Sequence, residues 1–145
     1  TENLSLGVNY AYLDSSLEED IPGENAFKGD RLPGSAEETH SIFLDYTRSL
    51  KSDLDLSLRL TQRYIGSRVT ALGGGDSVQT ASEVPSYDTT DLRLGITHNN
   101  GIEASLFANN IFNNIGVTWI EQAGFYERKR ITNPRVIGIN VGYNF

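Results

Sequence analysis

The stretch WIEQAGFYERKRITNPR, residues 119–135, holds the densest group of chemically versatile side chains in this sequence. It combines aromatic and basic residues, namely Trp119, Phe125, Tyr126, Arg128, Lys129 and Arg130. Aromatic rings provide stacking surfaces, and guanidinium groups donate charge-assisted hydrogen bonds to anionic oxygens. The composition of this stretch therefore suits an anionic ligand or a sugar.

The residues that would carry out catalysis are scarce. The sequence has no Cys, which excludes a thiolate nucleophile, a thiolate metal site and a disulfide framework. The EETH stretch at 37–40 sets carboxylates beside one of the two His, whereas a metal site needs several convergent ligands. No glycine-rich phosphate loop is followed by a helical pattern. We therefore predict that the protein is not an enzyme and has no catalytic, metal or cofactor site.

The overall charge excludes one further class of function. The net charge is −7 and the isoelectric point lies near 4.7. Nucleic-acid binding needs a basic surface, so we predict no nucleic-acid partner.

The elements that must position these residues are segments in which apolar and polar side chains alternate. There are six of them, at residues 3–13, 40–50, 52–64, 90–98, 101–112 and 136–145. In the third segment Leu54, Leu56, Leu58 and Leu60 lie on one side. Phe43 and Phe107 interrupt the alternation of the second and fifth segments. A period of two over such lengths indicates β-strands, and no segment shows a helical period.

The connections between these strands alternate between short and long. The second and third strands are joined across SLKSD, and the fourth and fifth across HNNG, whose Asn-Gly pair favours a hairpin turn. Three long connections, at about 14–38, 66–86 and 113–133, are rich in Gly, Pro, Ser and charge. Short turns at one end and long loops at the other are typical of the antiparallel up-and-down meander of an outer-membrane β-barrel.

The charged residues of the strands lie opposite the Leu, Ile and Val rows. They include Asp45, Asp55, Arg59, Arg63 and Arg93. In a barrel the apolar rows meet lipid and these charges face the lumen, where they could form pairs that hold a plug domain. A soluble sheet with one wet face alternates as well, so this pattern by itself leaves both environments open.

Two details favour lipid, besides the alternation of loop lengths. The strands are about 10 residues long, against about 5–6 in most globular proteins. Aromatic residues gather near strand ends, as in an interfacial girdle: Tyr10, Tyr12, Tyr46, Tyr64, Tyr87, Tyr143 and Phe145. Six strands cannot close a barrel, because the smallest bacterial barrels have about 8. We therefore expect a processed or excised piece, the C-terminal part of a larger transmembrane barrel.

Several motifs resemble those of a known family. The last strand is similar to the C-terminal signature of outer-membrane β-barrel proteins, with Tyr143 two positions before the terminal Phe145. NNIFNN (109–114) resembles the N-L-F-D/N strand end of TonB-dependent receptors, and TNPRVIGINVGYNF (132–145) resembles their closing strand, with Asn133 where Arg is commoner. GDRLPGSAEETHSIFLDY (29–46) resembles their entry into a late strand, without the second Pro.

The resemblance implies a function and partners. The chain would supply the last strands and extracellular loops of a barrel of about 22 strands in the bacterial outer membrane. The complete receptor would take up a scarce nutrient, a ferric siderophore or else cobalamin or an oligosaccharide, with energy from TonB acting on a plug domain. Tyr143 and Phe145 would be read by the barrel-assembly machinery.

Alternatives remain open on the residues alone. A passive porin or a small structural barrel would share the strand pattern, and a soluble carbohydrate-binding module would share the alternation. For the stretch 119–135, the resemblance suggests a siderophore or sugar as the small-molecule ligand. The simpler interpretation, which we favour at this point, is that its cations pair with lipopolysaccharide phosphates and its aromatic residues anchor the loop.

Overall fold

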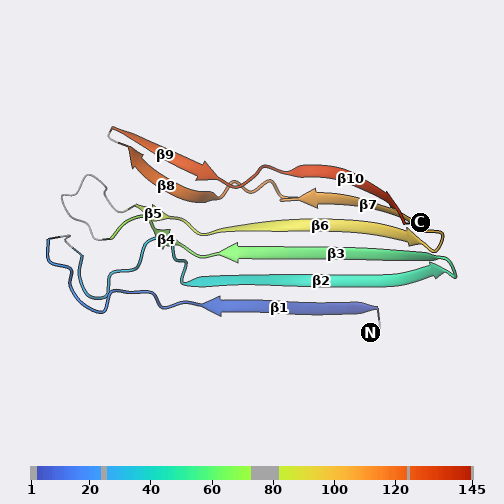
Figure 1. Ribbon diagram of the computed structural model, residues 1–145, viewed down its shortest axis with the longest axis horizontal. Coiled ribbons are helices and arrows are strands. Elements are labelled where there is room, and N and C mark those ends of the chain that lie inside the picture. Colours follow the sequence, from blue (N-terminus) through green and yellow to red (C-terminus); the bar gives the residue numbers. More distant parts are fainter. Residues whose placement is uncertain (1–2, 24–25, 73–81, 124, 145) are drawn as a thin grey trace.

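A six-stranded antiparallel sheet forms the body of the molecule in the computed structural model, which describes residues 3–23, 26–72, 82–123 and 125–144. Its strands run in the order β1-β2-β3-β6-β7-β10 as an open meander (Figure 1). They are β1 (Leu4–Tyr12), β2 (Glu38–Lys51), β3 (Leu54–Ile65), β6 (Tyr87–His98), β7 (Ile102–Asn109) and β10 (Val136–Tyr143). The all-β fold and its six long strands, predicted from the alternation, are confirmed. Within the described residues there is no helix that is long and apolar enough to cross a membrane.

The two ends of the sheet differ. The tight turns between β2 and β3 and between β6 and β7 lie at the same end as both chain termini, and the long connections lie at the opposite end (Figure 1). We call these the short-turn end and the long-loop end. Gly101, in the predicted Asn-Gly turn, has a φ of +92°, a conformation that glycine adopts without a steric penalty.

Two smaller sheets lie inside connections that the sequence presented as loops. β4 (Arg68–Val69) pairs with β5 (Glu83–Val84), and β8 (Val117–Ala123) pairs with β9 (Tyr126–Ile131). Neither pair joins the six-stranded sheet. The sequence did not predict β4 and β5, because two-residue strands are too short to show an alternation. It did not predict β9, because the run Glu127-Arg128-Lys129-Arg130 is charged on both faces.

The register aligns the apolar residues of all six strands. One continuous row crosses the whole sheet through Leu6, Leu44, Leu60, Leu92, Ala108 and Ile137. No other part of the described chain covers this face, since Leu6 is 69% exposed, Ile137 70% and Val141 72%. Among the described residues, the buried apolar side chains are only Ala26, Val84 and Ile120, none of them in the sheet. The apolar rows therefore do not pack into a core within this chain.

Phe43 and Phe107 lie on the opposite, polar face, and each one covers a glycine of a neighbouring strand. Gly7 pairs with Phe43, and a Cβ atom added at Gly7 would lie 2.0 Å from Cζ of that ring. Gly138 pairs with Phe107 in the same way, at 2.4 Å. Aromatic rings that fill the space above cross-strand glycines stabilise such positions and pin the register. The two interruptions of the alternation thus have a packing reason.

Candidate functional site

The β8–β9 hairpin carries the aromatic and basic residues that the sequence singled out. It extends beyond the sheet at the long-loop end (Figure 1). Phe125 and Tyr126 lie at its tip, where Phe125 is fully exposed. Trp119 and Arg130 are cross-strand partners nearer its base. The structure therefore separates the set into an exposed aromatic tip and a Trp–Arg pair.

Two of the three cations of the hairpin are engaged by its own carboxylates. Arg128 Nη1 lies 3.8 Å from Glu121 Oε2, and Lys129 Nζ lies 2.8 Å from Glu127 Oε1. The hydrogen bond from Lys129 lowers the pKa of the Glu127 carboxyl below its ordinary value. These pairs reduce the positive field of the hairpin. Arg130 has no ion-pair partner among the described residues, which leaves its guanidinium for an external anion.

Trp119 and Arg130 line a hollow of about 240 Å³. Its other walls are Ile120, Glu121 and Gln122 from β8 and the two residues that follow β4, Thr70 and Ala71. The hollow thus offers an aromatic ring, a guanidinium, an amide and a hydroxyl group in one place, beside the Glu121 carboxylate. This combination can stack a planar group and hydrogen-bond an anionic or hydroxylated one.

Arg68, which the sequence did not single out, joins the β4 turn to the hairpin. It is only 7% exposed, its Nη2 donates to the carbonyl oxygen of Thr118, and its guanidinium lies 5.7 Å from the centre of the Tyr87 ring. Gln122 Nε2 adds a second link, 3.3 Å from Ser82 Oγ. No local pattern could have revealed Arg68, because the residues it contacts, Thr118 of β8 and Tyr87 of β6, lie far from it in the sequence.

Tyr87 was grouped with the interfacial aromatic residues, and this expectation was wrong. In the register of β6 it falls on the same face as Arg93, and its ring packs against Gly116, where an added Cβ would lie 2.4 Å from Cγ. Tyr10, His40 and Tyr64 occupy the apolar face at that end instead, and His40 stacks on Tyr64 with ring centroids 4.7 Å apart.

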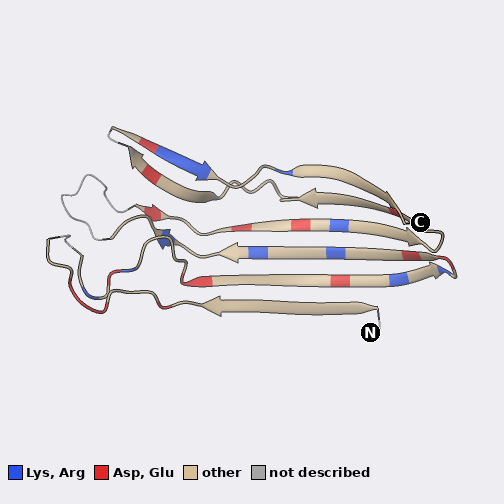
Figure 2. Ribbon diagram, viewed as in Figure 1, with Lys and Arg blue, Asp and Glu red and all other residues tan. Residues whose placement is uncertain are grey.

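Charged residues lie midway along β2, β3 and β6 (Figure 2), and the register places Asp45, Arg59 and Arg93 together on the polar face. Arg59 binds Asp45 through two nitrogens, at 2.6 and 2.9 Å. Arg63 pairs with Asp91, a residue that the sequence did not single out. Arg93 lies directly opposite Arg59 in the register and has no ion-pair partner in the described part of the chain.

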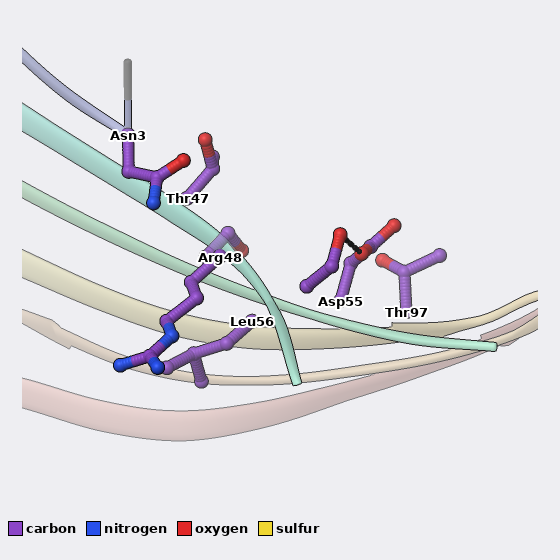
Figure 3. Close-up of a pocket in the computed structure, with 8 residues that line it drawn as sticks. Asn3, Thr47, Arg48, Asp55, Leu56 and Thr97 are labelled. Carbon is purple, nitrogen blue, oxygen red and sulfur yellow. Dashed lines mark hydrogen bonds between the residues drawn. The ribbon is translucent and has the colours of Figure 1, made fainter. Parts of the chain in front are cut away.

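Asp55 lies apart from these charges, in a hollow of about 400 Å³ near the short-turn end (Figure 3). Ser49 Oγ donates to its Oδ1 at 2.6 Å. The remaining lining residues are Asn3, Thr47, Arg48, Leu56, Ser57 and Thr97. The polar face is thus ionic in its middle and rich in hydroxyl groups near the short turns.

The last strand keeps its alternation to the end of the described chain. Tyr143 pairs with Ile102 and is 55% exposed on the apolar face. Phe145 lies outside the described residues. The two histidines lie at opposite ends of the sheet, His40 near the long-loop end and His98 at the short-turn end. His98 Nε2 lies 3.1 Å from Asp53 Oδ2. Among the described residues, no group of three or more His, Asp or Glu side chains is arranged to hold a metal ion.

Two of three comparisons with known proteins found a similarity, one to a family model and one to a solved fold. The family model described as TonB dependent receptor-like, beta-barrel, matches residues 2–111. The solved structure of the ferric-catecholate import receptor Fiu from E. coli K12, in its closed form, superposes on 100% of this chain with a TM-score of 0.72 and 21% sequence identity. The chain spans 19% of the length of that receptor. The search of curated proteins found no match.

Proposed function

Since this chain belongs to the TonB-dependent receptor β-barrel family of the bacterial outer membrane, we propose that the complete protein actively takes up a scarce nutrient. This chain would supply the last strands of the barrel and three extracellular loops. The observation that carries the proposal is the open antiparallel meander, whose apolar rows remain uncovered and whose fold matches a receptor barrel. A soluble module would have to cover those rows.

A ferric siderophore is the substrate class that the hairpin chemistry supports best. Fiu is, by its title, a ferric-catecholate import receptor, but at 21% identity that likeness concerns the fold alone. The ligand proposal therefore depends on Trp119 and Arg130. They present in one hollow a stacking surface and a guanidinium that has no ion-pair partner among the described residues. The exposed Phe125 and Tyr126 would make the first contact with the ligand at the tip. Arg128 and Lys129 would attract an anionic ligand more weakly, because carboxylates of the hairpin neutralise their charges.

Uptake by the complete receptor tests the proposal. Cells that express it would be supplied with iron-55 bound to a catecholate or a hydroxamate siderophore, with labelled cobalamin, and with a labelled maltodextrin. We expect accumulation of a ferric siderophore that is lost when TonB is deleted. Equal accumulation without TonB would indicate a passive porin and contradict the proposal, and TonB-dependent uptake of cobalamin or sugar alone would contradict the ligand class.

The role of Arg130 is tested by equilibrium binding. Loss of a hydrogen bond to a charged group costs about 1.5–3 kcal/mol, so Arg130→Gln should weaken siderophore binding roughly 10- to 140-fold. Arg128→Gln is the matched control, because that guanidinium already has a carboxylate partner on the hairpin. Equal losses in the two variants would show that the hollow has no special role.

The polar face would line the lumen and meet the plug domain. Partners within the chain are present for Asp45, Arg59, Arg63 and Asp55. Arg93 has no ion-pair partner in the part of the chain that the structure describes, so it is the position where we expect a carboxylate from the plug. Arg93→Gln should lower the unfolding temperature of the complete receptor but not that of a barrel without its plug. Arg59→Gln should lower both, and an equal effect of the two variants would contradict this assignment.

Two further partners follow from membership in the family. The uncovered apolar rows would contact acyl chains and lipopolysaccharide. Tyr143 and Phe145 would form the signal read by the barrel-assembly machinery, so we expect Tyr143→Ala to reduce the amount of folded receptor in the outer membrane. The readout is the heat-modifiable band on a gel, and an unchanged band would contradict that role.

A further inference from the structure

The β8–β9 hairpin is not part of the main sheet, so its direction is set by the segments that join it to β7 and β10, together with the links made by Arg68 and Gln122. We call these segments, residues 110–116 and 132–135, the stalks. Asn110 lies at the start of the first stalk, is only 5% exposed, and has a φ of 51°, in the left-handed region. Asn is one of the few residues other than Gly that adopts this conformation readily.

The side chain of Asn110 holds the two stalks together. Its Nδ2 donates to the carbonyl oxygens of Asn114 and Asn133, each at 2.9 Å, and its Oδ1 accepts from the backbone nitrogen of Asn114 at 3.0 Å. Thr132 reinforces the contact, since its Oγ1 donates to the same Asn114 oxygen at 3.0 Å. Of the three hydrogen bonds of this buried amide, the one to Asn133 links the two stalks, and the two to Asn114 hold the amide in one orientation within the first stalk.

Asp91 of β6 connects this junction to the barrel wall. Its Oδ1 accepts from the backbone nitrogen of Asn110 at 2.9 Å, and its Oδ2 accepts from Arg63 of β3. Both neighbours of this carboxylate are donors, and a carboxylate, which has acceptors on both oxygens, can serve both at once. Ile111 adds a backbone bond to Thr90 of β6 at 2.8 Å, which keeps the first stalk beside the same strand.

We propose that Asp91 and Asn110 are positioning residues, which set the direction in which the hairpin leaves the barrel and thereby the location of Trp119 and Arg130. The importance of that location for a ligand rests on the proposed function. The positioning itself depends only on the contacts described here. It also gives a structural role to Asn in the NNIFNN segment (109–114), since Asn110 and Asn113 both adopt left-handed backbone conformations.

The experiment measures hairpin position without a ligand, so its result does not depend on the nutrient or on uptake. Spin labels would be attached in the complete receptor at Phe125→Cys on the hairpin tip and at Tyr12→Cys at the end of β1, with any other cysteines of the receptor replaced. Double electron–electron resonance spectroscopy then gives the distribution of distances between the two labels. Heat-modifiable mobility on a gel shows that each variant forms a folded barrel.

Asp91→Asn is the central variant. An amide has one acceptor oxygen for the two donors, so either Arg63 or Asn110 then meets an N–H group, and we expect a broader or shifted distance distribution. In the double variant Arg63→Gln/Asp91→Asn, the glutamine oxygen can accept from the new amide, which frees its oxygen for Asn110 and restores the original distribution. Asp45→Asn, which disturbs the other ion pair of the polar face, is the control and should leave the distribution unchanged.

Three results would overturn the proposal: an unchanged distribution in Asp91→Asn, equal broadening in Asp45→Asn, or a double variant as broad as the single one. If Asp91→Asn does not reach the folded state, Asn110→Asp decides the question. It keeps the size and tolerates the backbone conformation, but it lacks the N–H groups that bind the carbonyl oxygens of Asn114 and, across the stalks, Asn133. A distribution in Asn110→Asp that matches the parent receptor would equally contradict the assignment.

Discussion

A single charge placed on each face of the central strand β3 tests which face meets the bilayer. Leu58 lies near the middle of β3 in an apolar row with Tyr46 and Leu94, and its chain neighbour Ser57 lies on the polar face beside a hollow with room for a longer side chain. Arginine on the lipid face of a barrel costs about 2–4 kcal/mol at the bilayer midplane and about 0–1 near the interfaces. Leu58→Arg should therefore lower the folding equilibrium constant roughly 25- to 700-fold.

Two control positions make the comparison specific. Leu54→Arg lies on the same face, but it pairs with His98 at the short-turn end, so its cost should fall to the interfacial value. Ser57→Arg should cost less than Leu58→Arg, because an arginine on the polar face keeps contact with water. The measurement is urea unfolding of the complete receptor in lipid vesicles, followed by tryptophan emission.

The reasoning would be refuted by equal costs at Leu58 and Ser57, since that would mean the two faces meet similar environments. A cost at Leu54 as large as at Leu58 would refute it differently. Such a result would indicate a packed protein core, whose penalty does not depend on depth in a membrane.

Three further predictions follow from particular contacts. Gly138→Val should destabilise the barrel by about 1–3 kcal/mol, because the added Cβ displaces the ring of Phe107 on β7. Gly142→Val is the control and should be tolerated in the same unfolding assay, because there is open space around Gly142. The pKa of Glu127 is lowered in the folded hairpin, so its contribution to hairpin stability is present above the unfolded-state pKa and is lost as the pH falls through the folded one. A carboxyl NMR titration should therefore give a midpoint below about 4.3, the ordinary Glu value, and Lys129→Ala should raise it toward that value, with the hydrogen bond from Gln122 still in place, while an unshifted midpoint in the parent would contradict the pair. Arg68→Met keeps an unbranched side chain but loses the guanidinium, with its bond to the β8 carbonyl and its place over the Tyr87 ring, so proteolysis within the hairpin should become faster. An unchanged rate would show that the guanidinium does not hold the hairpin.

Much of the sheet could be predicted because its pattern is local. The Leu rows of β3 and the alternation of β10 repeat every second residue, and this period alone specifies a strand and assigns its faces. The β8–β9 hairpin could not be predicted in the same way, because β9 is charged on both faces. The cross-strand cover of Gly7 by Phe43 also had no signal, since it requires the register of two strands whose partners are 36 residues apart.

The residues of the candidate site were also only partly predictable from the sequence. The sequence identified Trp119 and Arg130 by residue type but did not distinguish them from Arg128 and Lys129, which the fold neutralises with carboxylates on the same hairpin. Asp91 was not predicted as a site residue. The two groups that donate to it, Arg63 on β3 and the backbone nitrogen of Asn110 after β7, are brought close to it only by strand pairing.

The sequence by itself determined the class of fold, the number of long strands, the two faces of the sheet and the asymmetry of its ends, because side-chain alternation and turn composition are properties of neighbouring residues. Only the tertiary structure decided which charges are paired, where Arg68 is buried, and how the stalks of the hairpin are joined to the wall. These depend on strand register and on the meeting of separate loops, which align residues far apart in the chain.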